Sequence, residues 1–161
     1  MTARAHALWI PALTFVVALV LTIWPLPAWA EAWRPHWAAL TLIYWCLALP
    51  NRINIGVAWL VGVVLDVLHG ALLGQHALAL VLVAFLANRF HLQIRVFPVL
   101  QQTVAVTLLL AVYAFVLFWI SGATGVEIGF HRYIPALLTS ALLWPWTFAV
   151  LRHLRRTWQV G

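Results

Sequence analysis

The sequence predicts an all-α integral membrane protein, a compact bundle of six transmembrane helices in a single domain. Hydrophobic residues make up 66% of the 161 positions and charged residues only 7%, against roughly 25% charged residues in soluble domains. Apolar segments follow one another with short connections, which leaves no soluble module. Apolar and polar residues do not alternate with period two, and this excludes the pattern of a β-barrel.

Each apolar segment is interpreted as one membrane span. At 1.5 Å per residue the longest reaches about 33 Å, enough to cross a bilayer core of roughly 30 Å. The second and fourth are short for spanning, so we expect them to extend at their ends or to lie where the bilayer is thin. The predicted spans are residues 7–24, 36–49, 53–73, 76–90, 99–120 and 134–151.

The arginines predict the orientation of these spans. All nine basic residues are arginines, and basic residues are retained on the cytoplasmic side of a membrane. With the N-terminus inside, seven arginines fall on the inner side, while Arg34 and Arg132 fall outside. Both termini are therefore expected to be cytoplasmic. The inner arginines act as topology anchors that touch anionic lipid, and their charge is no evidence for nucleic-acid binding. Besides Arg4, these anchors are Arg52, Arg89, Arg95, Arg152, Arg155 and Arg156.

The first segment also resembles a secretory signal peptide. Arg4 precedes an apolar stretch, and Ala28-Trp29-Ala30 has the small-x-small pattern of a cleavage site. The stretch is longer than the roughly 7–15 residues of a signal-peptide core. We therefore expect an uncleaved first span.

The third segment carries a regular row of small residues that includes the only aspartate of the chain. Residues four apart lie along one ridge of a helix, and small residues on such a ridge let another helix approach closely in lipid. The row is therefore interpreted as a contact for a partner helix. It consists of Ala58, Gly62, Asp66, Gly70 and Gly74.

A polar cluster is predicted around Asp66, in the outer half of the membrane, with His69, Gln75 and His76. A carboxylate within a span costs roughly 2.5–3.5 kcal/mol and must face protein or water. Three interpretations remain open. In the first, Asp66 is a metal ligand, although third and fourth ligands are missing. In the second, it belongs to a proton or substrate relay. In the third, it is a structural carboxylate. The structural interpretation, which includes holding a partner protein, is favoured, and no metal or cofactor is expected.

Catalytic patterns are absent from the sequence. Intramembrane aspartyl chemistry needs two carboxylates that share a proton, and Asp66 stands alone. The H-E-x-x-H motif of zinc proteases does not occur, and a serine–lysine pair is impossible without lysine. The chain is therefore not expected to be an enzyme.

Several motifs, taken in order, resemble one bacterial family. The row that contains Asp66 follows Pro50-Asn51-Arg52-Ile53-Asn54-Ile55-Gly56, and Gln101-Gln102 and Leu143-Trp144-Pro145-Trp146 come later. This order is similar to that of the rod shape-determining protein MreD family, across nearly the whole chain. The resemblance implies an inner-membrane subunit of the cell-elongation machinery that supports lateral peptidoglycan synthesis and rod shape. It also implies a fold like that of the substrate-binding subunits of energy-coupling-factor transporters.

The resemblance implies partners as well. Members of the family associate with the single-span protein MreC, and through it with MreB, RodA and penicillin-binding protein 2. A small-molecule binding subunit of a membrane transporter is the alternative function. An outward pocket with several convergent polar groups would favour that alternative.

Overall fold

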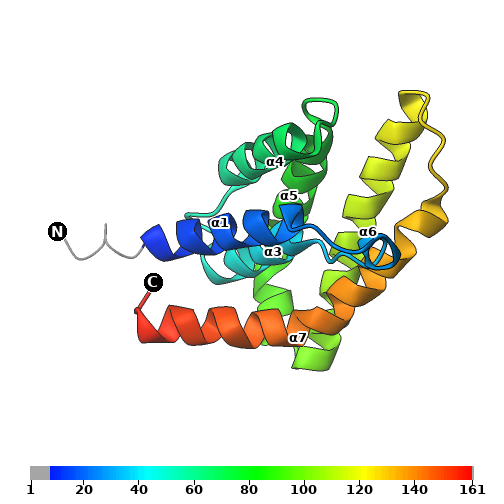
Figure 1. The fold of residues 1–161 in the computed structure, drawn as a ribbon. Helices are drawn as coiled ribbons and strands as arrows, with labels where there is room; N and C mark the ends of the chain where they lie inside the picture. Colours follow the sequence, from blue (N-terminus) through cyan, green and yellow to red (C-terminus); the bar gives the residue numbers. More distant parts are fainter. Residues whose placement is uncertain (1–7, 161) are drawn as a thin grey trace.

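The computed structural model describes residues 8–160, and all regular structure within them is helical. Six apolar helices correspond in order to the six predicted segments, and two short helical pieces lie in the connections (Figure 1). The order is α1 (Trp9–Ile23), α2 (Ala28–Glu31), α3 (Trp37–Ala48), α4 (Ile55–His69), α5 (Gln75–Val96), α6 (Val99–Ala123), η3 (Phe130–Arg132) and α7 (Ile134–Thr157).

Three of the helical stretches are long and apolar enough to cross a membrane. They are α5, α6, and the stretch Phe130–Thr157 that joins η3 to α7. The apolar helices α1, α3 and α4 are shorter, with 15, 12 and 15 residues. The protein therefore has the character of a helical membrane protein, while the count of six crossings stays a prediction.

The helix α3 forms the centre of the bundle. All eleven residues from Ala38 to Ala48 are buried, and α3 packs against α1, α5 and α7. A helix that is apolar on every side is suited to such full enclosure. The indole N–H of Trp45 donates a hydrogen bond to Thr14 Oγ1 of α1 at 2.8 Å. The shortest predicted span is thus the core around which the longer helices are arranged.

The helix boundaries differ most from the predicted spans at three places. The helix α4 ends at His69, whereas the predicted span continued to residue 73, because Gly70 adopts a left-handed conformation with φ of 61°. The helix α5 continues past residue 90 to Val96, and α7 continues past residue 151 to Thr157. Both carry arginines in these extensions, so an apolar criterion misses helical turns that lie beyond the apolar segment.

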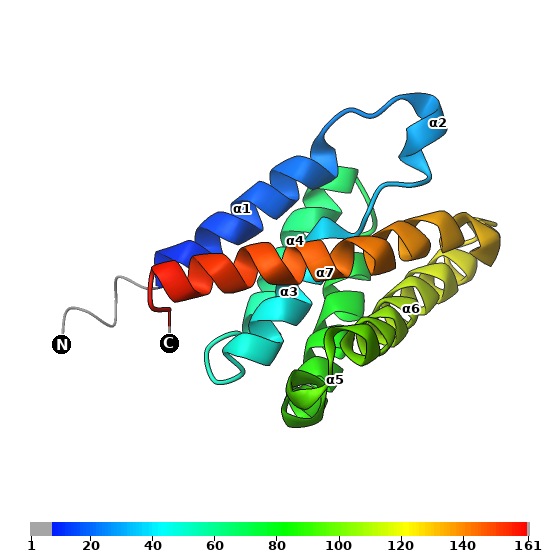
Figure 2. The same cartoon turned by 90° about the horizontal axis from the view of Figure 1, so that it is seen from below.

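The two ends of the described chain lie on the same side of the bundle. The first turn of α1 and the end of α7 are neighbours in both views (Figures 1 and 2). The rings of Trp9 and Trp158 meet edge to face, with centroids 5.4 Å apart. The α2 connection lies at the opposite end of α1 and α7 (Figure 2). This arrangement is what an even number of membrane crossings requires.

Candidate functional site

The tightest helix contact in the fold lies between α4 and α5. Gly62 faces the backbone of α5 so closely that a Cβ atom there would overlap Ala77 Cα and lie 2.6 Å from Ala77 N. Only glycine fits such an approach of two backbones. Ala58, one turn earlier on the same ridge, is completely buried. The ridge predicted for a partner helix therefore packs against a helix of the same chain.

Asp66 is completely buried one turn beyond Gly62 and caps the N-terminus of α5. Its Oδ2 accepts a hydrogen bond from Gly74 N at 2.8 Å, and its Oδ1 accepts one from His76 N at 2.8 Å. Ala77 N lies 3.5 Å from Oδ2, at the limit of a hydrogen bond. The first N–H groups of a helix have no partner within the helix and carry a partial positive charge. A carboxylate supplied by another helix satisfies both needs.

The last two glycines of the predicted row lie outside the helix. Gly70 ends α4, and Ala71 N donates to Asp66 O at 3.0 Å. Gly74 precedes α5 with φ of 101°. Left-handed conformations are costly for residues with a Cβ atom. The prediction that these two glycines continue one helical ridge is wrong, because they form the turn that brings α5 back along α4.

The histidines of the predicted cluster lie beside this cap. His76 Nδ1 is 2.8 Å from Asp66 Oδ1, and the imidazole rings of His69 and His76 stack with centroids 5.0 Å apart. His69 Nδ1 lies 2.9 Å from Leu65 O. Asp66, His69 and His76 thus lie together, while their position in the outer half of the membrane stays a prediction.

The side chain of Gln75 does not join the group formed by Asp66, His69 and His76. Its Nε2 donates to Ser121 Oγ at 3.2 Å. This hydrogen bond ties the start of α5 to the end of α6.

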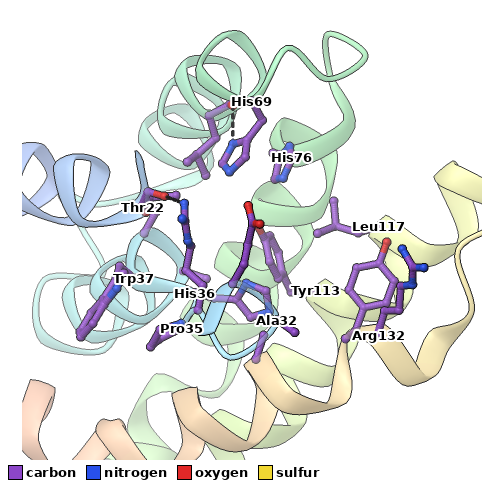
Figure 3. Close-up of a pocket in the computed structure, with 17 residues that line it drawn as sticks. Thr22, Ala32, Pro35, His36, Trp37, His69, His76, Tyr113, Leu117 and Arg132 are labelled. Carbon is purple, nitrogen blue, oxygen red and sulfur yellow. Dashed lines mark hydrogen bonds between the residues drawn. The ribbon is translucent and has the colours of Figure 1, made fainter. Parts of the chain in front are cut away.

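A cavity of about 260 Å³ opens below the stacked histidines (Figure 3). It lies at the end of the bundle that carries the α2 connection, and residues of α2 and η3 contribute to its wall. His36 Nε2 is buried there without a hydrogen-bond partner, and its ring meets Tyr113 edge to face at 5.0 Å. The polar side chains that line the cavity include Arg34, His36, His69, His76, Tyr113 and Arg132.

One side of the cavity is formed by the connection that contains α2, which hydrogen bonds hold in place. Both terminal nitrogens of Arg34 donate to backbone carbonyls at the end of α1, Nη1 to Thr22 O and Nη2 to Trp24 O. Ser140 of α7 accepts a hydrogen bond from His36 N at 2.9 Å. These contacts hold the α2 connection against α1 and α7, and they place His36 at the cavity.

The side chains that line the cavity are suited to hydrogen bonding with a ligand. Between residues 8 and 160, no group of three or more His, Cys, Asp or Glu side chains is arranged to hold a metal ion. Both Asp66 oxygens accept from backbone N–H groups, which can only donate. The carboxylate is thus engaged in joining α4 to α5. His36 Nε2 is buried without a partner, and the side chains of Glu31, His69, Tyr113 and Arg132 also line the cavity, so these groups can meet a ligand.

Sequence reasoning missed Tyr113 and undervalued His36. Tyr113 lies in the middle of α6, and only the single phenol within a long apolar run hinted at a role. His36 is the first residue of the second predicted span, and nothing in its neighbourhood in sequence indicated that it faces Tyr113. Contacts between residues so far apart in the chain are decided by the packing of whole helices.

The predicted topology anchors lie near the ends of two helices and in one turn. Arg52 is in the turn between α3 and α4, and Arg89 and Arg95 are near the end of α5. The remaining three occupy the end of α7. Four of the six line one pocket, which is described below.

Comparison with known proteins identifies the family. The model of the rod shape-determining protein MreD family matches residues 3–154. The chain belongs to the MreD family. A rod shape-determining protein MreD from Haemophilus influenzae is 32% identical over 142 residues, which cover 88% of each chain. No solved structure matches the chain, so the resemblance to transporter subunits stays a prediction.

Membership of the MreD family defines the role at the level of the cell. The family determines rod shape, and it is not a family of enzymes. The resemblance stated from the sequence motifs is therefore confirmed, and so is the classification as a non-enzyme. The partners and the molecular action are not given by the family name.

Proposed function

We propose that this protein is a multi-pass subunit of the cell-elongation complex in the bacterial inner membrane, with both termini in the cytoplasm. It binds MreC and so supports lateral peptidoglycan synthesis and rod shape. MreB, RodA and penicillin-binding protein 2 are reached indirectly through MreC. The observation that carries this proposal is the match to the MreD family over residues 3–154.

The proposal requires a surface for the transmembrane helix of MreC. The predicted row on α4 offers little surface, because Ala58, Gly62 and Asp66 are buried against α5. Contact of a partner with that row stays a prediction, and it would require α5 to move aside. A surface that is open in the fold is a better candidate.

The groove between α1 and α7 has the shape that a third helix needs. Its volume is about 310 Å³. Leu13, Val17 and Leu21 form one i, i+4 row along its α1 wall, while Leu143 and Thr147 begin a similar row on α7. Two parallel rows form a groove that receives the ridge of another helix. Small side chains on the floor, such as Ala18 and Thr41, permit close approach.

The test is to fill this groove and measure the binding of MreC. We expect Val17→Trp to reduce co-purification of MreC from membranes and to impair rod shape, at unchanged protein level. Val104→Trp is the matched control, because Val104 is a similarly exposed apolar residue on α6, at 59% against 50% for Val17. Equal binding of MreC by the two variants would show that the groove holds only lipid.

The alternative, a small-molecule binding subunit of a membrane transporter, has one observation in its favour. The cavity beside His36 and Tyr113 brings several polar side chains together, and such a pocket was named above as favouring that function. Its volume of about 260 Å³ lies just below the roughly 300–1,000 Å³ of ligand sites. Thermal stabilisation of the purified protein by a member of a vitamin panel would support this function, and failure of the whole panel would remove it.

A further inference from the structure

A second pocket, of about 540 Å³, lies at the end of the bundle where α3, α5 and α7 end and α6 begins. This volume is within the roughly 300–1,000 Å³ typical of ligand sites. Its polar lining comes from four helices, α3, α5, α6 and α7, and from the residues that follow α7. These side chains include Tyr44, Arg95, Gln102, Arg152, Arg155 and Arg156.

The four arginines of this pocket have no acidic counterpart in the described part of the chain. The whole sequence has only three acidic residues, Glu31, Asp66 and Glu127, and none of them lines the pocket. Asp66 is engaged at the start of α5, where it contacts His76, and within residues 8–160 no other carboxylate lies within ion-pair distance of a basic side chain. Within residues 8–160, four positive charges therefore converge at the pocket without a compensating carboxylate.

The helix ends account for only part of this charge. The C-terminal end of an α-helix carries a partial negative charge of roughly half an electron. The C-terminal ends of α3, α5 and α7 and the N-terminal end of α6, which carries the opposite partial charge, together offset roughly one of the four guanidinium charges by this measure. Most of the positive charge is left for a ligand.

Local contacts hold two of the four arginines, Arg152 and Arg155, at the pocket. The Arg152 guanidinium carbon lies 5.7 Å from the centroid of the Phe148 ring. Arg155 Nε donates to Val160 O at 3.3 Å. After α7 the chain turns back at Gln159, whose φ is 48°, and Val160 is only 3% exposed. Arginines that only anchored a helix end in water would need no such turn.

We propose that this pocket binds a phosphate-bearing anion, carried on a lipid or free in solution. Guanidinium groups donate paired hydrogen bonds that match the geometry of phosphate oxygens. Basic pockets between helices at the cytoplasmic side of a membrane bind phosphorylated headgroups by the same chemistry. Gln102 is buried and its Nε2 donates to Ile94 O at 3.4 Å, so the arginines are the main donors that the pocket offers to an anion.

The test uses delipidated full-length protein in neutral detergent. Thermal unfolding is measured with dihexanoyl phosphatidic acid, with dihexanoyl phosphatidylcholine and with inorganic phosphate, each at the same concentration. At about ten times the dissociation constant, a bound ligand should raise the Tm by about 3–6 °C. We expect phosphatidic acid, but not phosphatidylcholine, to do so.

Paired variants separate the pocket from general surface charge. Arg95→Gln with Arg155→Gln removes two pocket arginines, while Arg52→Gln with Arg89→Gln removes two arginines that do not line the pocket. We expect only the pocket pair to weaken binding, by about tenfold or more. If the pocket pair does not fold, Arg95→Lys with Arg155→Lys keeps the charge but loses the paired hydrogen bonds, and should still weaken binding severalfold.

The outcomes divide clearly. Stabilisation by phosphatidic acid alone supports the proposal with a lipid as the source of the phosphate. Equal stabilisation by inorganic phosphate supports it with a free anion as the source. Stabilisation by phosphatidylcholine to the same degree, loss of binding in both pairs of variants, or no stabilisation at all would overturn it.

Discussion

Asp66 is a buried carboxylate in an apolar helix, and its burial requires compensating contacts. A carboxylate is costly within a span, yet Asp66 is completely buried. The structure resolves this conflict because three N–H groups at the start of α5 point at its two oxygens. The cost of burial is offset by hydrogen bonds that those N–H groups would otherwise lack.

Substitution of Asp66 should separate the loss of hydrogen bonds from the loss of charge. Asn keeps one acceptor oxygen but points an NH₂ group at an N–H donor of α5, so we expect Asp66→Asn to be moderately destabilised. Asp66→Leu leaves the N–H groups of both Gly74 and His76 unpaired, at about 1–3 kcal/mol for each. Thermal unfolding in detergent should rank the proteins wild type, Asn, Leu.

Two results would contradict the capping role of Asp66. Wild-type stability in Asp66→Leu would show that the hydrogen bonds to α5 contribute nothing. Wild-type stability of both variants combined with loss of rod shape in both would favour a relay or ligand function instead.

At the scale of helices, α4 and α5 behave as one hairpin. The contact at Gly62, the cap at Asp66 and the left-handed Gly70 and Gly74 follow one another along its length. Each element depends on the one before it, because the carboxylate reaches the start of α5 only if the two backbones lie close. A single added methyl group should therefore be felt throughout the hairpin.

We expect Gly62→Ala to lower the stability of the protein by about 1–3 kcal/mol, as overpacking does in other cores. The new Cβ would overlap the α5 backbone, which cannot rotate away as a side chain can. Gly122→Ala is the matched control, because no atom lies within 4 Å of a Cβ atom at that position. Equal melting temperatures for the two variants would show that α5 can shift without cost.

At the scale of the whole molecule, the distribution of arginines agrees with the arrangement of the helix ends. The contact of Trp9 with Trp158 places the start of α1 and the end of α7 on one side, where the arginine-rich end of α7 also lies. The α2 connection, which carries Arg34, lies at the other end (Figure 2). The fold and the positive-inside rule therefore support the same topology.

Reporter fusions should place the C-terminus in the cytoplasm, and cysteine labelling should place residues 25–36 and 124–133 in the periplasm. The reason is the seven-to-two division of arginines between the two sides. A C-terminus found outside would refute the count of six crossings. It would also conflict with the proximity of α1 and the end of α7.

The sequence by itself determined the class, the helices and the family. Apolar segments of span length, short connections and clustered arginines are local properties, and local properties can be recognised in any fold. The position of Asp66 within an apolar run also predicted a buried carboxylate that needs partners, and His76 is one of them. Gly70 and Gly74 were misjudged because glycine suits both a close helix contact and a left-handed turn, and spacing alone cannot distinguish these uses.

Only the tertiary structure decided that α5, rather than a partner, covers the α4 ridge. It alone brought four of the arginine anchors around one pocket and His36 to Tyr113. These contacts join residues far apart in the chain, and they depend on the angles at which complete helices pack.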